Sequence, residues 1–324
     1  MRKIKWGVLG TAGIARKQTI PGMQQAENCE LYAIAGRSLE KARQFQADFG
    51  FEKAYGSYEA LLNYPVVEAV YIPMPNELHC EWTVKALRAH KHVLCEKPLA
   101  PNEAQVKEMI AAAEETGMCL MEAFAYLHSP YVAALKNEIA SGVIGDVLYL
   151  ESAFITPTPA ADNIRMRRET YGGALYDLGC YTTSLATWLM GMEPEKVTAS
   201  ADFSDQGIAL YTSAILTYPG GARAALDSGM VLSRATGRID RLQIHGTRGK
   251  ILSDVPFNQP GELRYTVIAD GKTEVKTVTA RHNYALEVEQ LGRCITDGEQ
   301  PHVSHAFTLM NARVIDRILE KTGY

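Results

Sequence analysis

The chain has 324 residues and a formal net charge of −4, which argues against a nucleic-acid or membrane-surface role because either needs a basic face. No apolar run is long enough to span a bilayer, and the length suggests two domains. Residues 1–6 lack the apolar core of a signal peptide, and none of the six cysteines forms a C-x-x-C pair. We therefore expect reduced thiols and a cytoplasmic protein.

The turn after the first predicted strand, residues 4–10, reads Gly-Thr-Ala-Gly-Ile-Ala, a dinucleotide-binding fingerprint with alanine at its second and last glycine positions. The first glycine suits a tight turn, and the following helix N-terminus offers N–H groups to a pyrophosphate. We expect Gly10, Thr11, Ala12, Gly13 and Ile14 to bind the cofactor, with the phosphates shifted slightly by Ala12. Taken alone, so degenerate a fingerprint is explained equally well by a plain glycine-rich turn.

Strand and helix patterns alternate up to residue 123, which is typical of a doubly wound parallel sheet. The further predicted strands cover 30–35, 66–72, 93–95 and 118–123, and the predicted helices cover 39–49, 80–89 and 103–117. Arg37 and Ser38 stand where an acidic residue would bind the ribose 2′-hydroxyl, and they suit a 2′-phosphate. They predict NADP, with NAD as the alternative if Arg37 is only a solvated loop residue.

Two loops point to the nicotinamide end of this domain. The first starts at Pro73, is stiffened by two prolines, and leads to Asn76 and His79, which we expect to bind the cofactor. The second is Glu96-Lys97-Pro98, where the proline ends strand pairing and places Lys97 at the carboxyl end of a central strand. Glu96 is predicted to anchor the cofactor ring or to pair with Lys97. A solvated lysine closing a strand is the plainer alternative.

The pattern changes beyond residue 123. Strands are predicted at 147–155, 196–203 and 208–218, and turns at 218–221, 246–249 and 269–272. No helical pattern interrupts residues 196–280, so we expect a large, mostly antiparallel open sheet in an α+β domain. Helices are predicted at 131–141, 176–190, 284–297 and 306–321.

Asp177 and Tyr181 are four residues apart, so a helix would place both on one face. Oxidising an alcohol requires removal of its proton. A nearby ammonium such as that of Lys97 would help a phenol, with its usual pKa of about 10, to act as a base. We expect Lys97, Tyr181 and Asp177 to be catalytic, with the roles of Lys97 and Tyr181 interchangeable. Alternatively, Tyr181 is a core residue and Asp177 a helix cap. No metal is implied, because no carboxylate or cysteine cluster joins the loop histidines at 302 and 305.

The motifs in this order resemble the glucose–fructose oxidoreductase/inositol dehydrogenase (Gfo/Idh/MocA) family over essentially the whole chain. They are the fingerprint, Pro-Asn-Glu-Leu-His at 75–79, Glu-Lys-Pro at 96–98, Glu-Ala-Phe at 122–124 and the segment 172–181. The resemblance implies an NAD(P)-binding Rossmann domain over residues 1–122. It also implies a substrate-binding and dimerisation domain over 123–324, whose open sheet forms a homodimer.

Tyr181, where many relatives carry histidine, and Arg37 resemble the branch of dimeric dihydrodiol dehydrogenases and NADP-dependent D-xylose dehydrogenases. In that branch Arg165 is expected near the cofactor or substrate, whereas Leu127 departs from the arginine that many relatives carry. The expected function is hydride transfer between NADP and a hydroxyl or carbonyl of a sugar or polyol. The alternatives are a redox-assisted glycosidase or lyase and a non-catalytic cofactor-sensing regulator.

Overall fold

The computed structural model describes residues 2–324, which form two compact units. The first unit contains the chain up to Ala100, Ala104–His128 and Arg281–Thr308. The second contains Pro101–Glu103, Ser129–Ala280 and Leu309–Tyr324. The chain thus returns to the first unit after completing most of the second. The domain boundary expected between residues 122 and 123 stays a prediction.

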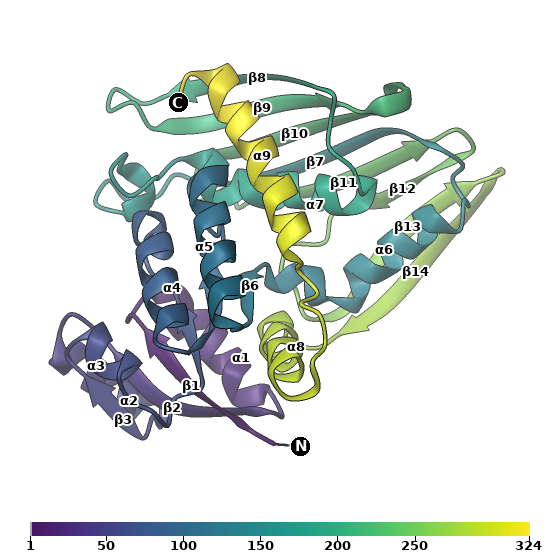
Figure 1. The fold of residues 1–324 in the computed structure, drawn as a ribbon. Coiled ribbons are helices and arrows are strands. Elements are labelled where there is room, and N and C mark those ends of the chain that lie inside the picture. The colour runs from purple at the N-terminus through teal and green to yellow at the C-terminus, as the bar shows by residue number, and fades with distance from the viewer. Residues whose placement is uncertain (1) are drawn as a thin grey trace. The chain divides into compact units, whose positions relative to one another are not determined.

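The first unit is built on a six-stranded parallel sheet with the order β3-β2-β1-β4-β5-β6, which is that of dinucleotide-binding folds. Figure 1 shows β3, β2 and β1 side by side at one end of this sheet. Its strands are β1 (Ile4–Leu9), β2 (Cys29–Ala35), β3 (Lys53–Tyr55), β4 (Ala69–Ile72), β5 (His92–Glu96) and β6 (Leu120–Ala123). Its helices are α1 (Ile20–Gln25), α2 (Leu39–Phe49), α3 (Tyr58–Leu62), α4 (His79–Arg88), α5 (Glu103–Thr116) and α8 (Asn283–Asp297). The predicted doubly wound parallel sheet is confirmed, and β3 and α3 are additions to it.

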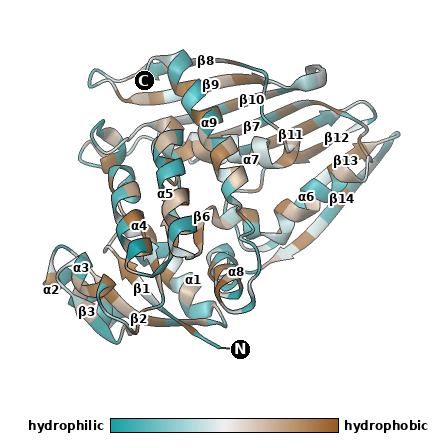
Figure 2. Ribbon diagram, viewed as in Figure 1, coloured by the Kyte–Doolittle hydropathy of each residue, from teal (hydrophilic) through white to brown (hydrophobic). Residues whose placement is uncertain are grey.

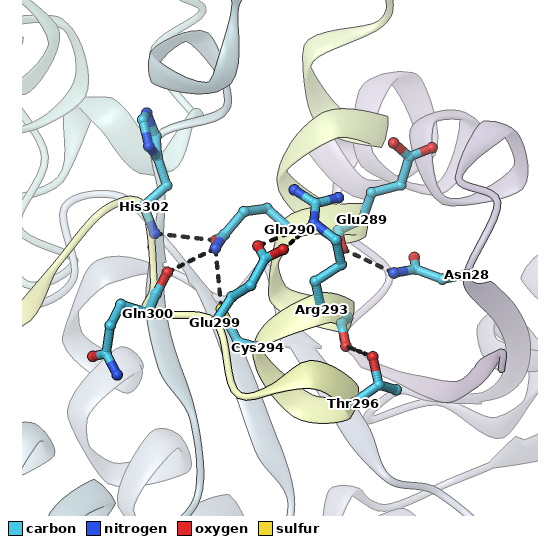
Figure 3. Close-up of polar contacts among 10 residues, drawn as sticks. Asn28, Glu289, Gln290, Arg293, Cys294, Thr296, Glu299, Gln300 and His302 are labelled. Carbon is cyan, nitrogen blue, oxygen red and sulfur yellow. Dashed lines mark hydrogen bonds and ion pairs between the residues drawn. The ribbon is translucent and has the colours of Figure 1, made fainter. Parts of the chain in front are cut away.

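Helix α8 packs against α1 and β5 and completes the first unit. The Asn28 side-chain amide donates to the Glu289 carbonyl at 2.8 Å, and a Cβ on Gly292 would lie only 2.2 Å from Asn28 Nδ2. Beyond α8, the Gln290 side chain donates to the Gln300 carbonyl at 2.9 Å and accepts from the His302 amide at 3.1 Å (Figure 3). These contacts fasten both the helix and the segment after it.

The second unit is built on an eight-stranded sheet with the order β14-β13-β12-β11-β7-β10-β9-β8. Its strands are β7 (Val147–Pro157), β8 (Lys196–Phe203), β9 (Ala209–Thr217), β10 (Arg223–Leu232), β11 (Ile239–Gly246), β12 (Gly249–Ser253), β13 (Gly261–Ala269) and β14 (Lys272–Ala280). Only β7 and β10 pair in parallel among the described strands of this sheet, so the predicted mostly antiparallel sheet is confirmed.

One face of this sheet carries helix α7 (Cys180–Met190), which packs against β7 and β10. Helix α6 (Pro130–Ala140) contacts α7 and β14, and helix α9 (His305–Thr322) ends the chain. Hydrophobic and hydrophilic residues alternate along strands such as β13 (Figure 2), as they do where one sheet face is buried. No helix within residues 2–324 is both long and apolar enough to cross a membrane.

Candidate active site

The carboxyl ends of β1, β2 and β4 bring the fingerprint next to two other loops of the first unit. Gly10 has φ +140°, which glycine adopts readily, and its amide donates to the Ala35 carbonyl at 2.9 Å. A Cβ on Gly10 would lie 3.5 Å from Pro73 Cγ, and a Cβ on Gly36 would lie 3.3 Å from Thr11 Cγ2. The loops after these three strands therefore lie together at the carboxyl-end edge of the parallel sheet, where dinucleotides bind in this kind of fold.

The helix after the fingerprint leaves open space at its start. It begins at Gly13, where an added Cβ would meet nothing within 4 Å, and the neighbouring Ala12 and Ile14 are half-buried. Its next residues, Ala15–Thr19, form a π-helical turn before α1. The uncovered helix N-terminus fits the pyrophosphate of a nicotinamide cofactor, because its N–H groups point toward an anion.

Arg37 and Ser38 follow β2 at the same edge. The Arg37 side chain is exposed, and Ser38 Oγ accepts from the Lys41 amide at 3.3 Å as the N-cap of α2. The guanidinium and the positive end of the α2 dipole both favour a phosphate on the ribose 2′-oxygen. These residues therefore fit NADP.

His79, which we expected to contact the cofactor, lies between two loops of the first unit. Its ring is fully buried, with Nδ1 2.9 Å from the Pro98 carbonyl and Nε2 2.7 Å from the Met74 carbonyl. Burial lowers the pKa of His79. Each ring nitrogen faces a carbonyl oxygen, and the neutral ring donates its one N–H to either of them, so His79 joins the loop after β4 to the loop after β5, beside half-buried Asn76.

Glu96 is the last residue of β5, and its carboxylate accepts a hydrogen bond from the buried residue Tyr71. The Tyr71 hydroxyl donates to Glu96 Oε1 at 2.6 Å, and Thr19 Oγ1 donates to the Tyr71 hydroxyl at 2.8 Å. Lys97 follows, half-buried, and its amide donates to Glu96 Oε2 at 3.3 Å. The Lys97–Pro98 peptide bond is cis. Sequence reasoning missed Tyr71, whose only signal was a hydroxyl within an apolar strand.

Glu122 lies near the end of the adjacent strand β6, where its charge interacts with that of Lys97. The sequence did not predict this interaction. Its carboxylate accepts from the Leu99 amide at 2.8 Å. Complete burial raises the pKa of Glu122 to about 7, although the Leu99 hydrogen bond, the Thr308 side chain and the Lys97 charge act in the opposite direction. The signal available in the sequence was a glutamate at the carboxyl end of a parallel strand.

Asp177 and Arg165 form an ion pair in the second unit. Arg165 Nε lies 2.5 Å from Asp177 Oδ2, and Asp177 belongs to a π-helical turn, Leu175–Gly179, that leads into α7. The double glycine fixes Arg165, because the Gly173 amide donates to its carbonyl at 2.8 Å and a Cβ on Gly172 would lie 2.4 Å from that oxygen. Arg165 is thus held beside a predicted catalytic carboxylate.

Tyr181 is half-buried and packs against two aromatic rings that also stack on each other. Its ring centroid lies 5.5 Å from that of Phe154 and 5.1 Å from that of Phe257, and its hydroxyl accepts from Asn258 Nδ2 at 3.4 Å. Sequence reasoning missed Phe257 and Asn258, which come from the loop between β12 and β13. Among residues 2–324 no group of three potential ligands could hold a metal ion.

Comparison with known proteins agrees with this geometry. Residues 4–124 match the family model described as "Oxidoreductase family, NAD-binding Rossmann fold", and residues 132–252 match the Gfo/Idh/MocA C-terminal domain. An NADP(+)-dependent D-xylose 1-dehydrogenase of Haloferax volcanii is 35% identical, covering 97% of this chain and 96% of its own. A trans-1,2-dihydrobenzene-1,2-diol dehydrogenase of Xenopus laevis is 33% identical, covering 98% of both chains.

The fold also matches a 3-ketoreductase from Actinomadura kijaniata, solved with NADP and TDP-benzene. The TM-score is 0.93 at 30% identity, over 99% of this chain and 98% of that one. An aldose–aldose oxidoreductase from Caulobacter crescentus matches with a TM-score of 0.91 at 25% identity, over 99% and 98% of the two chains. The chain therefore belongs to the Gfo/Idh/MocA family of NAD(P)-dependent oxidoreductases.

Proposed function

We propose that the protein is an NADP(H)-preferring oxidoreductase that acts on a CH–OH or carbonyl group of a sugar or polyol. The observation that carries the proposal is Tyr181, a half-buried phenol with a polar donor on its oxygen, one turn beyond the ion-paired Asp177. Such a phenol can hold or release the proton of a reacting hydroxyl. The nicotinamide, when bound, accepts or delivers the hydride.

Each residue of the proposed catalytic set has a distinct task. Tyr181 exchanges a proton with the reacting oxygen, and the Lys97 ammonium stabilises the phenolate and polarises that oxygen. Asp177, oriented by Arg165, accepts a hydrogen bond from a neighbouring substrate hydroxyl. General acid–base help of this kind contributes about 10²–10⁴-fold.

The relatives support this assignment. Variants of the Actinomadura 3-ketoreductase were solved in which a lysine is replaced by alanine or glutamate and a tyrosine by phenylalanine. Those two positions are separated by the same number of residues as Lys97 and Tyr181. The relatives are named as dehydrogenases and reductases, which favours net hydride transfer over a redox-assisted lyase or a sensor.

We also propose a cytoplasmic homodimer that forms through the large sheet. The face of the sheet opposite α7 presents partly exposed apolar residues, among them Ile215 and Val231, together with the ion pair of Arg241 and Glu151. A mixed apolar and charged face of this kind suits a second copy of the chain. All six cysteines are free thiols, as expected for the cytoplasm.

The test is a turnover screen of sugars, polyols and diols with NADP and NAD, followed by Lys97→Met and Tyr181→Phe on the best substrate. Each variant should lower kcat by about 10²-fold or more while NADPH binding is retained. The surface changes Lys85→Met and Tyr32→Phe serve as controls. Full turnover in both active-site variants would refute the catalytic assignment.

A further inference from the structure

The loop between β12 and β13 places an amide on the Tyr181 hydroxyl. Asn258 Nδ2 lies 3.4 Å from the phenolic oxygen, and Phe257 packs on Tyr181 at 5.1 Å and stacks on Phe154 at 5.2 Å. A catalytic hydrogen bond of this length commonly shortens when substrate binds. The loop therefore contributes both a packing surface and a polar group to Tyr181.

A separate set of contacts fixes this loop. The Phe257 amide donates to Asp240 Oδ1 at 3.1 Å, and the Asp240 side chain is 4% exposed. Asp240 is paired with Arg238 at 2.5 Å, and the Arg238 guanidinium lies 4.6 Å from the centroid of the Phe154 ring. Asn258 is thus presented by a braced segment rather than by a freely moving one.

The backbone at Asn258 restricts which residues can stand there. Its φ of +64° is left-handed, a conformation that glycine, asparagine and aspartate adopt at little cost. Of these three, only asparagine offers an N–H donor to the phenol. Glycine offers nothing, and aspartate presents a negative charge.

We propose that Asn258 is a positioning residue for Tyr181, whose role as acid/base is the proposed function on which this inference rests. Its N–H donates to the phenolic oxygen, so the phenolic proton is directed away from Asn258, toward substrate. The same donor stabilises the phenolate when that proton has left. In the second unit the charged groups nearby are the ion pair of Asp177 and Arg165 and that of Arg238 and Asp240. Lys97 of the first unit is the cation that the proposed function adds to them.

The experiment measures the pH dependence of kcat for alcohol oxidation in the full-length protein with Asn258→Gly and Asn258→Asp. Both changes keep the left-handed backbone. Glycine should raise the midpoint of the rising limb by about half a unit to one unit, and aspartate should raise it further, because its charge opposes the phenolate. Below the midpoint kcat should fall about threefold to tenfold for glycine. The KM for NADP should stay unchanged, and Gln259→Ala is the neighbouring control.

Four outcomes decide whether Asn258 positions Tyr181. The role of Asn258 is overturned if both variants keep the wild-type pH profile of kcat, or if kcat falls by the same factor at every pH. In a Tyr181→Phe background, Asn258→Gly should cause no further loss, because the two residues act as a unit. Full activity of Tyr181→Phe itself would instead overturn the proposed function, so the two failures are distinguishable.

Discussion

Tyr71 donates a 2.6 Å hydrogen bond to Glu96, the residue that directly precedes Lys97. Tyr71 in turn accepts from Thr19, which closes the π-helical turn after the fingerprint. A buried line of hydroxyl and carboxylate groups therefore joins the start of the cofactor site to the strand that carries the lysine. Burial and the Glu96 charge raise the pKa of Tyr71 well above its usual value, so it stays a donor.

Removing the Tyr71 hydroxyl should weaken this connection. Tyr71→Phe deprives Glu96 of a donor, and we expect the free energy of unfolding to fall by about 1–3 kcal/mol, with a several-fold lower kcat. Urea denaturation and steady-state kinetics measure the two effects. Tyr218→Phe is the matched control, since Tyr218 is equally buried but its hydroxyl has no hydrogen-bond partner among residues 2–324. Equal stability of the two variants would contradict the prediction.

Glu122 should make stability depend on pH. Its pKa is about 7 in the folded chain against 4.5 for an ordinary glutamate, so the folded state holds the proton more tightly. The resulting stabilisation is complete below about pH 4.5 and is lost as the pH rises through about 7. In wild type the free energy of unfolding should therefore decline between these pH values, and Glu122→Gln should make that decline smaller by on the order of 3 kcal/mol.

The measurement for Glu122 is denaturant unfolding of wild type and variant between about pH 5 and pH 8. Buried Glu287, whose pKa is also raised, remains in both proteins, so the difference isolates Glu122. Glu115→Gln, at an exposed position on α5, should leave the decline intact. Identical slopes for wild type and Glu122→Gln would show that Glu122 does not titrate in this range.

Gly172→Ala should displace Arg165. The new Cβ would lie 2.4 Å from the Arg165 carbonyl and 2.7 Å from that of Arg167, so the backbone must move. We expect a loss of about 1–3 kcal/mol in stability and about tenfold in kcat/KM. Gly298→Ala, in open space with φ +72°, costs about 1 kcal/mol and should leave kcat/KM unchanged.

Arg37 should set the choice between the two cofactors. Arg37→Ala removes the charge that we propose contacts the 2′-phosphate, so the KM for NADP should rise at least about tenfold while that for NAD stays constant. Arg43→Ala, exposed on α2, is the matched control. Unchanged NADP affinity would remove the basis for the NADP preference.

The sequence predicted the parallel sheet because its core strands are apolar runs that end in turn residues. It missed β3, since three partly exposed residues show no periodicity. It also missed the π-helical turn at Leu175–Gly179, which depends on tertiary packing. A Cβ on Gly179 would lie 2.9 Å from Ser228 Oγ of β10, a contact between segments distant in the chain.

Motif residues that follow strands, such as Gly10, Arg37 and Lys97, could be proposed for the site from the sequence, and their roles stay predictions. For His79 the expected cofactor contact stays a prediction, and a helix-start pattern could not reveal that its ring lies between the Pro98 and Met74 carbonyls. Asn258 had no signal at all. Its contact with Tyr181 is created by the pairing of β11 with both β7 and β12 across the second sheet.

The late return of the chain to its first unit has a consequence during synthesis. Val288 and Leu291 of α8 are fully buried, and α8 packs on α1, where Ile20 and Met23 form part of the core. Until this helix has left the ribosome, α1 lacks that covering and exposes apolar surface. The unit that begins the chain is therefore among the last to be finished.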